Sequence, residues 1–342
     1  MTDKPSHRHV PKNKKFRRLS LHLKRQPFAA MTIDADLLAY YDLMARKYPT
    51  PENAPAPTPQ EVRAKFATVA VEALRPLPAG LRSETFDIPL PGRNLRARLY
   101  RPVGRSVPLV VYFHGGGWVV GDVDTHGTVA ALLAQDADVA VLSVDYRLAP
   151  EHPFPTPVDD AREALAWAAE QRARLGVSLD RLAVAGDSAG GHLAAQAAAW
   201  FNDKHPGMVG AQLLIYPVVQ YRFDTPSYER LADGVGLTRD EMRWYWKEFL
   251  GDVEPAQDDV RVNLMAQAPR HPLPNSLVIA AEYDPLHDEA VEYAQFVART
   301  GARAEIIEAA GLTHSFARLQ PFVPQARMVM HDAAQRLREW LG

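Results

Sequence analysis

The chain has 342 residues, of which 47% are apolar and 23% are charged, a composition typical of a globular protein with a sizeable core. It contains no cysteine, which excludes a disulfide framework, a thiolate metal site and a cysteine nucleophile. No apolar stretch is long enough to span a membrane, so stable membrane insertion is not expected. The net charge of −2 conceals an asymmetry, because residues 1 to 25 carry nine Lys or Arg and one acid.

The basic first segment, residues 1 to 30, is predicted to be a disordered extension. The alternative is a basic arm for nucleic acid or anionic lipid, but no nucleic-acid partner is predicted. The segment lacks the continuous apolar region of a secretory signal, which favours a cytoplasmic protein. A sharper hypothesis makes Met31 the natural start, because the acidic, helix-patterned sequence "MTIDADLLAYYDLMARKY" begins there.

Two helices are predicted next, over residues 33 to 48 and 59 to 75, because apolar residues of the first follow a helical period. The stretch "PTPENAPAPTPQ" separates them with five prolines. The segments "ETFDIPL" and "NLRARLYR" then alternate apolar and polar residues around the turn "PGRN". This pattern predicts an antiparallel hairpin.

From Pro108 onward, short apolar segments alternate with helical ones, which predicts an α/β fold with a mostly parallel sheet covered on both faces. The expected strands are "PLVVYF", "VAVLSVDY", "RLAVAG", "AQLLIYP", "SLVIAAEY" and "AEIIEAA", with helices near 126 to 135, 157 to 174, 189 to 203, 286 to 300 and 323 to 341. Residues 220 to 270 interrupt this rhythm and include an expected helix over 239 to 250. They are interpreted as an insertion between residues 76 to 219 and 271 to 342, which form the main domain.

The segment "LAVAGDSAGGHLAAQAAA" places Ser188 between an apolar strand and an alanine-rich helix. The surrounding glycines fit the G-x-S-x-G template, in which a tight turn exposes the serine hydroxyl. Ser188 is therefore the candidate nucleophile. The alternative is a serine that only caps the following helix.

A serine nucleophile needs a histidine base oriented by a carboxylate, and α/β hydrolases supply them in the order Ser, Asp or Glu, His, each after a strand. Asp284 in "EYDPLHDEA" and His314 in "GLTHSF" fit that order. Asp284 also fits a helix N-cap followed by proline, and Glu282 and Asp288 are nearby alternatives. The alternative for His314 is an ordinary surface-loop histidine.

The stretch "HGGGW" follows the first buried strand, where glycine amides can approach a developing oxyanion closely. The expected oxyanion donors are the backbone N–H groups of Gly115, Gly116 and Ala189. A flexible glycine loop is the alternative. The charged, proline-rich stretch "DYRLAPEHPFP" is assigned a structural role, with Arg147 paired to a neighbouring acid.

Together "HGGGW", "YRLAPEHPFP", "GDSAGG", "DPLHDE" and "THSF" resemble the bacterial esterases of the hormone-sensitive-lipase branch of the α/β-hydrolase fold, over about residues 31 to 341. The resemblance implies Ser188, Asp284 and His314 as the catalytic triad and no metal or organic cofactor. It also implies a helical cap built from residues 31 to 75 and 220 to 270. Two positions depart from the family pattern, because His287 stands where Arg is usual and Ser315 where Gly is frequent.

The expected reaction is hydrolysis of short- to medium-chain acyl esters, with a small-molecule ester as the partner. Substrate-pocket candidates are Trp118, Asp187, Leu237, Met242, Tyr245 and Trp246, with Trp244 weighed beside them and packing within the cap as the alternative. Two other functions stay open: a non-catalytic small-molecule receptor of the same fold, and an amide, carbamate or lactone hydrolase using the same triad. A homodimer through an edge strand is a family expectation.

Overall fold

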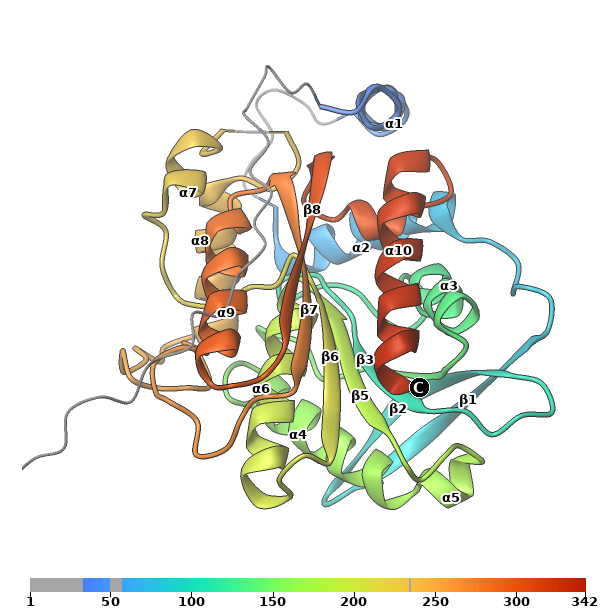
Figure 1. Ribbon diagram of the computed structural model, residues 1–342. Coiled ribbons are helices and arrows are strands. Elements are labelled where there is room, and N and C mark those ends of the chain that lie inside the picture. Colours follow the sequence, from blue (N-terminus) through green and yellow to red (C-terminus); the bar gives the residue numbers. More distant parts are fainter. Residues whose placement is uncertain (1–32, 50–56, 234) are drawn as a thin grey trace, which may run out of the picture. The chain divides into compact units, whose positions relative to one another are not determined.

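The computed structural model describes residues 33–49, 57–233 and 235–342. The predictions for residues 1–30 and for Met31 lie outside this part of the chain. Within it, eight strands form one sheet in the order β1-β2-β4-β3-β5-β6-β7-β8 (Figure 1). The strands are β1 (Leu81–Leu90), β2 (Arg93–Pro102), β3 (Leu109–Phe113), β4 (Ala140–Val144), β5 (Leu182–Asp187), β6 (Val209–Ile215), β7 (Asn275–Tyr283) and β8 (Ala304–Thr313).

The sheet is mostly parallel, as predicted. β1 and β2 form the expected antiparallel hairpin, and β2 joins β4 antiparallel. β4, β3, β5, β6, β7 and β8 are all parallel to one another. Because their carboxyl ends lie at one edge, residues that follow different strands are brought together there.

Helices cover both faces of the sheet, and every residue of β3, β4 and β5 is therefore buried. Helices α4, α6 and α9 lie on one face of the sheet, and α3 and α10 lie on the other (Figure 1). Along β3, Val111 belongs to the core on the first face and Tyr112 to the core on the second. The helices are α1 (Ala35–Lys47), α2 (Pro59–Ala73), α3 (Gly127–Ala137), α4 (Thr156–Glu170), α5 (Arg172–Leu175), α6 (Ala189–Lys204), α7 (Pro226–Arg230), α8 (Arg239–Leu250), α9 (His287–Arg299) and α10 (Pro324–Leu341), with a 3-10 turn η1 (Phe316–Leu319).

One predicted helix is interrupted. The sequence pattern predicts a single helix over residues 157 to 174, but Gln171, with φ −94° and ψ 11°, leaves the α-helical region and separates α4 from α5. The predicted helix over 239 to 250 is α8, whose N-terminus is closed by a capping box between Thr238 and Glu241. Among the described helices, none is both long and apolar enough to cross a lipid bilayer.

Buried polar contacts hold the loop after β4. Arg147 donates to Asp160 Oδ2 through its backbone N–H and Nε, both at 2.9 Å, and to Oδ1 through Nη2 at 2.8 Å. Arg63 of α2 donates to the carbonyls of Val119 and Ala149, each at 2.6 Å. The loop therefore serves as a structural support that also ties α2 to the carboxyl edge of the sheet.

Candidate active site

Ser188 lies in a strained turn between β5 and α6. Its backbone has φ 54° and ψ −121°, a conformation that a non-glycine residue adopts only when its surroundings enforce it. A Cβ on Gly186 would collide with the backbone of Gly190, and a Cβ on Gly190 would collide with the carbonyl of Phe113. The two glycines are thus required by close backbone approach, and the hydroxyl of Ser188 makes no hydrogen bond to the first turn of α6.

The three residues expected to act together are in direct contact. His314 Nε2 lies 2.8 Å from Ser188 Oγ, and His314 Nδ1 lies 2.6 Å from Asp284 Oδ2. Asp284 is fully buried, and 6% of the surface of Ser188 and of His314 is exposed. The parallel order of β5, β7 and β8 brings these residues together, although 126 positions separate the serine from the histidine.

The structure discriminates among the carboxylates considered from the sequence. Asp284 uses Oδ1 to accept the backbone N–H of Leu286 at 2.9 Å, so it stabilises the loop before α9 as well as contacting His314. Glu282 accepts the N–H of Gly311, and Asp288 contacts His287 and the N–H of Ser227. Of the three carboxylates, Asp284 is therefore the one in contact with the imidazole of His314. Ser188 makes no side-chain capping bond to α6.

In the glycine run, Gly115 to Gly117, one backbone amide differs from its predicted role. The N–H of Gly115 donates to Asp187 Oδ1 at 2.8 Å and is not free to meet an oxyanion. Gly116 and Gly117 instead line the cavity beside Ser188. Among the described residues, neither amide donates a hydrogen bond. Ala189 begins α6, where a backbone N–H has no partner inside the helix. The amides available to a ligand in the cavity are therefore those of Gly116, Gly117 and Ala189, whereas the predicted Gly115 amide is not.

Asp187 contacts two further buried side chains besides the amide of Gly115. Its Oδ1 also accepts the hydroxyl of Tyr112 at 2.5 Å, and its Oδ2 lies 3.7 Å from His126 Nε2. Burial holds the pKa of His126 well below its ordinary value, so the ring is neutral. Sequence reasoning did not identify Tyr112 or His126, since nothing in their local pattern signals a contact so distant in sequence.

A cavity of about 270 Å³ opens above Ser188 and His314. Its walls come from α1, α2, the glycine run, the N-terminal half of α8 and η1. Four of the pocket candidates line it: Asp187, Leu237, Met242 and Tyr245.

Two pocket candidates require correction, because Trp118 and Trp246 do not line the cavity. Both are fully buried, with ring centroids 4.6 Å apart, and Phe249 stacks on Trp118 at 4.2 Å. On α8, Met242 and Tyr245 line the cavity. Trp246 follows Tyr245 directly, so its side chain leaves the helix in a different direction and enters the core. Trp244 is also absent from the lining.

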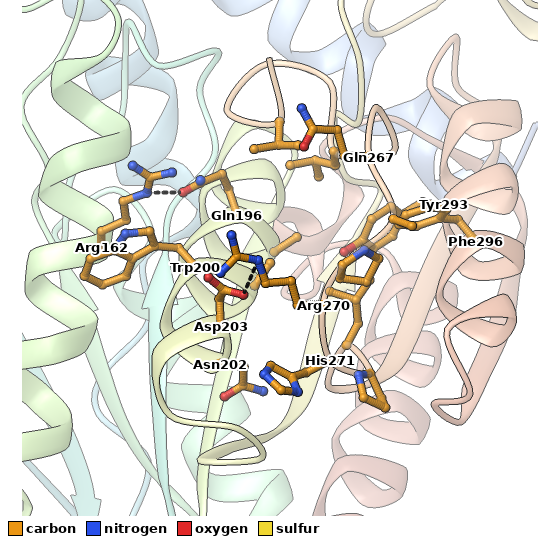
Figure 2. Close-up of a pocket in the computed structure, with 18 residues that line it drawn as sticks. Arg162, Gln196, Trp200, Asn202, Asp203, Gln267, Arg270, His271, Tyr293 and Phe296 are labelled. Carbon is orange, nitrogen blue, oxygen red and sulfur yellow. Dashed lines mark hydrogen bonds and ion pairs between the residues drawn. The ribbon is translucent and has the colours of Figure 1, made fainter. Parts of the chain in front are cut away.

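A second cavity, of about 320 Å³, lies between α6, α9 and the segment around residues 260–273 (Figure 2). Figure 2 shows Arg162 contacting Gln196, and Arg270 contacting Asp203, along its wall. Its lining includes none of Ser188, Asp284 or His314. The cavity above Ser188 is therefore the one placed for chemistry.

A serine in a strained strand-to-helix turn, with an acid and a histidine following later parallel strands, is the arrangement of an α/β hydrolase. The chain belongs to this family: residues 110–318 match the α/β-hydrolase fold family, and the predicted resemblance to bacterial esterases is confirmed.

Relatives and a solved structure with esterase names support this family assignment. The chain is 35% identical over 311 residues to an ethyl acetate hydrolase of Pseudomonas putida, covering 86% of this chain and 95% of that protein. It is 39% identical over 241 residues to the carboxylic ester hydrolase LipN of Mycobacterium tuberculosis, covering 68% of this chain but 64% of LipN. A hyperthermophilic esterase from Pyrobaculum calidifontis superposes with a TM-score of 0.82 at 35% identity, over 90% of this chain and 99% of that one.

Proposed function

We propose that the protein is a serine carboxylesterase that hydrolyses short- to medium-chain acyl esters through Ser188, His314 and Asp284. The class, carboxylic ester hydrolase, rests on the family and on its esterase relatives. One observation carries the mechanism: His314 contacts Ser188 Oγ through one ring nitrogen and Asp284 through the other. This is the geometry in which a histidine can remove the serine proton.

In the acylation step, His314 Nε2 takes the proton of Ser188 as Oγ bonds to the ester carbonyl carbon. The carbonyl oxygen becomes an oxyanion, stabilised by the N–H groups of Gly116, Gly117 and Ala189. The intermediate then breaks its bond to the alcohol oxygen, which receives the proton from Nε2. The alcohol leaves, and the acyl group remains bonded to Ser188.

In the deacylation step, His314 Nε2 takes a proton from water as the water oxygen attacks the acyl carbon. The second intermediate releases Ser188 Oγ, which recovers the proton from Nε2, and the carboxylic acid leaves. Asp284 stabilises the charged imidazole during both steps. The carboxylate can do so because its Oδ2 already faces Nδ1 at 2.6 Å.

Substrate size is proposed from the cavity. A volume of about 270 Å³, bounded by Leu237, Met242 and Tyr245, suits small esters better than long acyl chains. The relative from Pseudomonas putida is named for ethyl acetate, which supports a short acyl preference. Residues 31–75 and 220–270 are proposed as the cap, because α1, α2 and α8 supply the walls facing Ser188.

Two other functions remain alternatives. A non-catalytic receptor does not need the contacts of His314 with Ser188 and Asp284, whereas here both contacts are present. An amide, carbamate or lactone hydrolase would use the same groups and differ only in the leaving atom. A cytoplasmic location and a homodimer remain predictions from the sequence.

The test is turnover of p-nitrophenyl esters from acetate to palmitate by the wild type and by Ser188→Ala. Ser83→Ala, on the exposed face of β1, is the matched control. Activity that peaks at short chains, is retained in Ser83→Ala and is lost by about 10⁴-fold or more in Ser188→Ala supports the proposal. A folded Ser188→Ala protein with full turnover contradicts it, and highest activity on long-chain triglyceride emulsions contradicts the proposed chain length.

A further inference from the structure

The cavity above Ser188 contains a cation without an ion pair. Arg318 lies on η1, four residues after His314, and lines the cavity together with it. Within the described part of the chain, its guanidinium makes no hydrogen bond and has no carboxylate within 4 Å. Its contact is the ring of Phe66, whose centroid lies 4.2 Å from the guanidinium carbon.

The two acidic side chains of the cavity lining are engaged elsewhere. Glu241 Oε2 accepts the N–H and the hydroxyl of Thr238, at 2.8 and 2.9 Å, in the capping box of α8. Asp187 holds Gly115 and Tyr112. Neither carboxylate forms an ion pair with Arg318, so the N–H donors of its guanidinium remain available to a ligand in the cavity.

Two phenols and an imidazole of the lining add no charge near Arg318. Burial raises the pKa of Tyr41, and burial raises that of Tyr245 to about 12, while the positive charge of Arg318 opposes both rises. The phenols stay neutral at physiological pH. His126 is also neutral, because burial lowers its pKa.

A half-buried guanidinium with unused N–H donors favours an anionic partner that can accept two parallel hydrogen bonds. We propose that Arg318 is a specificity residue, and that the preferred substrates are esters that carry a carboxylate in addition to the ester group. This inference rests on the proposed function, because it concerns the same cavity. The carboxylate can belong to the acyl part or to the alcohol part of the ester.

The test compares two pairs of substrates that differ in one carboxylate. Mono-p-nitrophenyl adipate against p-nitrophenyl hexanoate probes the acyl side, and p-carboxyphenyl butyrate against p-tolyl butyrate probes the alcohol side. Each pair is measured with the wild type, Arg318→Met, Arg318→Lys and the control Arg105→Met. Arg105 lies in the loop before β3, at the edge of the sheet opposite the carboxyl ends of the parallel strands. It pairs with Asp138.

The expected result is a preference for the anionic ester in at least one pair. Arg318→Met should lower kcat/KM for that ester by about tenfold to a hundredfold, mainly through KM, and leave its neutral partner nearly unchanged. Arg318→Lys should recover part of the loss, since it retains the charge but not the planar donors. Added salt should reduce the preference, and Arg105→Met should not.

A purely structural role for Arg318, such as fixing Phe66 and α2, predicts equal losses on charged and neutral esters, and that result overturns the inference. Binding of p-hydroxybenzoate and of p-cresol is measured in parallel by the protein's intrinsic fluorescence. If no ester is turned over, the proposed function fails, but tighter binding of p-hydroxybenzoate that depends on Arg318 still supports the anion site. Where neither substrate pair shows a preference that depends on Arg318, equal binding of both phenols by wild type and Arg318→Met overturns it.

Discussion

The backbone N–H of Gly115 donates to the carboxylate of Asp187 at 2.8 Å, across 72 positions of sequence. The two residues lie side by side because β3 and β5 are parallel neighbours that end together. The contact fixes the start of the glycine run against the turn that carries Ser188. Asp187 is therefore a positioning residue for the two amides that follow Gly115.

Replacing Asp187 should separate positioning from chemistry. Asp187→Ala leaves the buried Gly115 amide and Tyr112 hydroxyl without acceptors, which costs about 1–3 kcal/mol for each group. We expect kcat to fall by about tenfold to a hundredfold with little change in KM, because displaced amides stabilise the oxyanion less well. Asp187→Asn retains an acceptor for Gly115 and should lose less. Steady-state kinetics and thermal melting measure both effects, and an unchanged kcat in a folded Asp187→Ala protein would show that the glycine run positions itself.

Gly117→Ala tests the proposed role of Gly117 in the oxyanion hole. Gly117 has φ 58°, and an added Cβ would collide with the ring of Tyr245. We expect at least a tenfold loss of kcat/KM on p-nitrophenyl butyrate. The matched control is Gly207→Ala, which has φ 76° but no atom within 4 Å of the added Cβ. It should cost about 1 kcal/mol of stability through backbone strain and leave kinetics unchanged. Equal kinetic effects of the two variants would contradict a role for Gly117.

His287 makes stability depend on pH. Burial alone would lower its pKa, but hydrogen bonds to Glu308 and Asp288 outweigh burial and raise the pKa to about 9. A pKa raised above the unfolded value stabilises the fold fully below about pH 6.5. That contribution is lost as pH rises towards and through 9. Glu308 is half exposed, so the change is about 1–2 kcal/mol rather than the full linkage value.

The measurement is the free energy of unfolding in urea at pH 6, 8 and 10 for the wild type, His287→Gln and His287→Arg. His287→Gln should be less stable than the wild type at pH 6, and its free energy of unfolding should lack the wild-type fall between pH 6 and pH 10. His287→Arg places there the residue usual in the family, and it should keep the stability at pH 10. A wild-type slope that persists in both variants would assign the titration to another group.

Adjacent residues of α8 should respond differently. Trp246 is buried against Trp118, so Trp246→Ala should cost about 3–5 kcal/mol of stability with the chain-length profile unchanged. Tyr245 lines the cavity, so Tyr245→Ala should move the preferred acyl chain to greater length. Melting temperature and p-nitrophenyl ester profiles separate the two. Trp244→Ala should do neither, and a shifted profile in Trp246→Ala would place its ring in the substrate path.

Local patterns in the sequence were enough to predict the alternation of strands and helices, the turn at Ser188 and the order of Asp284 and His314. Each depends on neighbouring residues: periodicity for the elements, close glycines for the turn, and position after a strand for the polar groups. Even the antiparallel hairpin of β1 and β2 follows from alternation around a short turn.

Contacts between distant segments were decided by the tertiary structure. Asp187 accepts the amide of Gly115, so the proposed oxyanion donors are Gly116 and Gly117 rather than Gly115 and Gly116. On α8, Trp246 enters the core whereas Tyr245 lines the cavity. Arg318 is left without a direct ion-pair partner, while Glu241 and Asp187 accept hydrogen bonds from other groups. Hydrogen-bond partners and side-chain directions depend on which strands become neighbours and on competition for each buried donor and acceptor. A one-dimensional pattern contains the candidates, but packing selects among them.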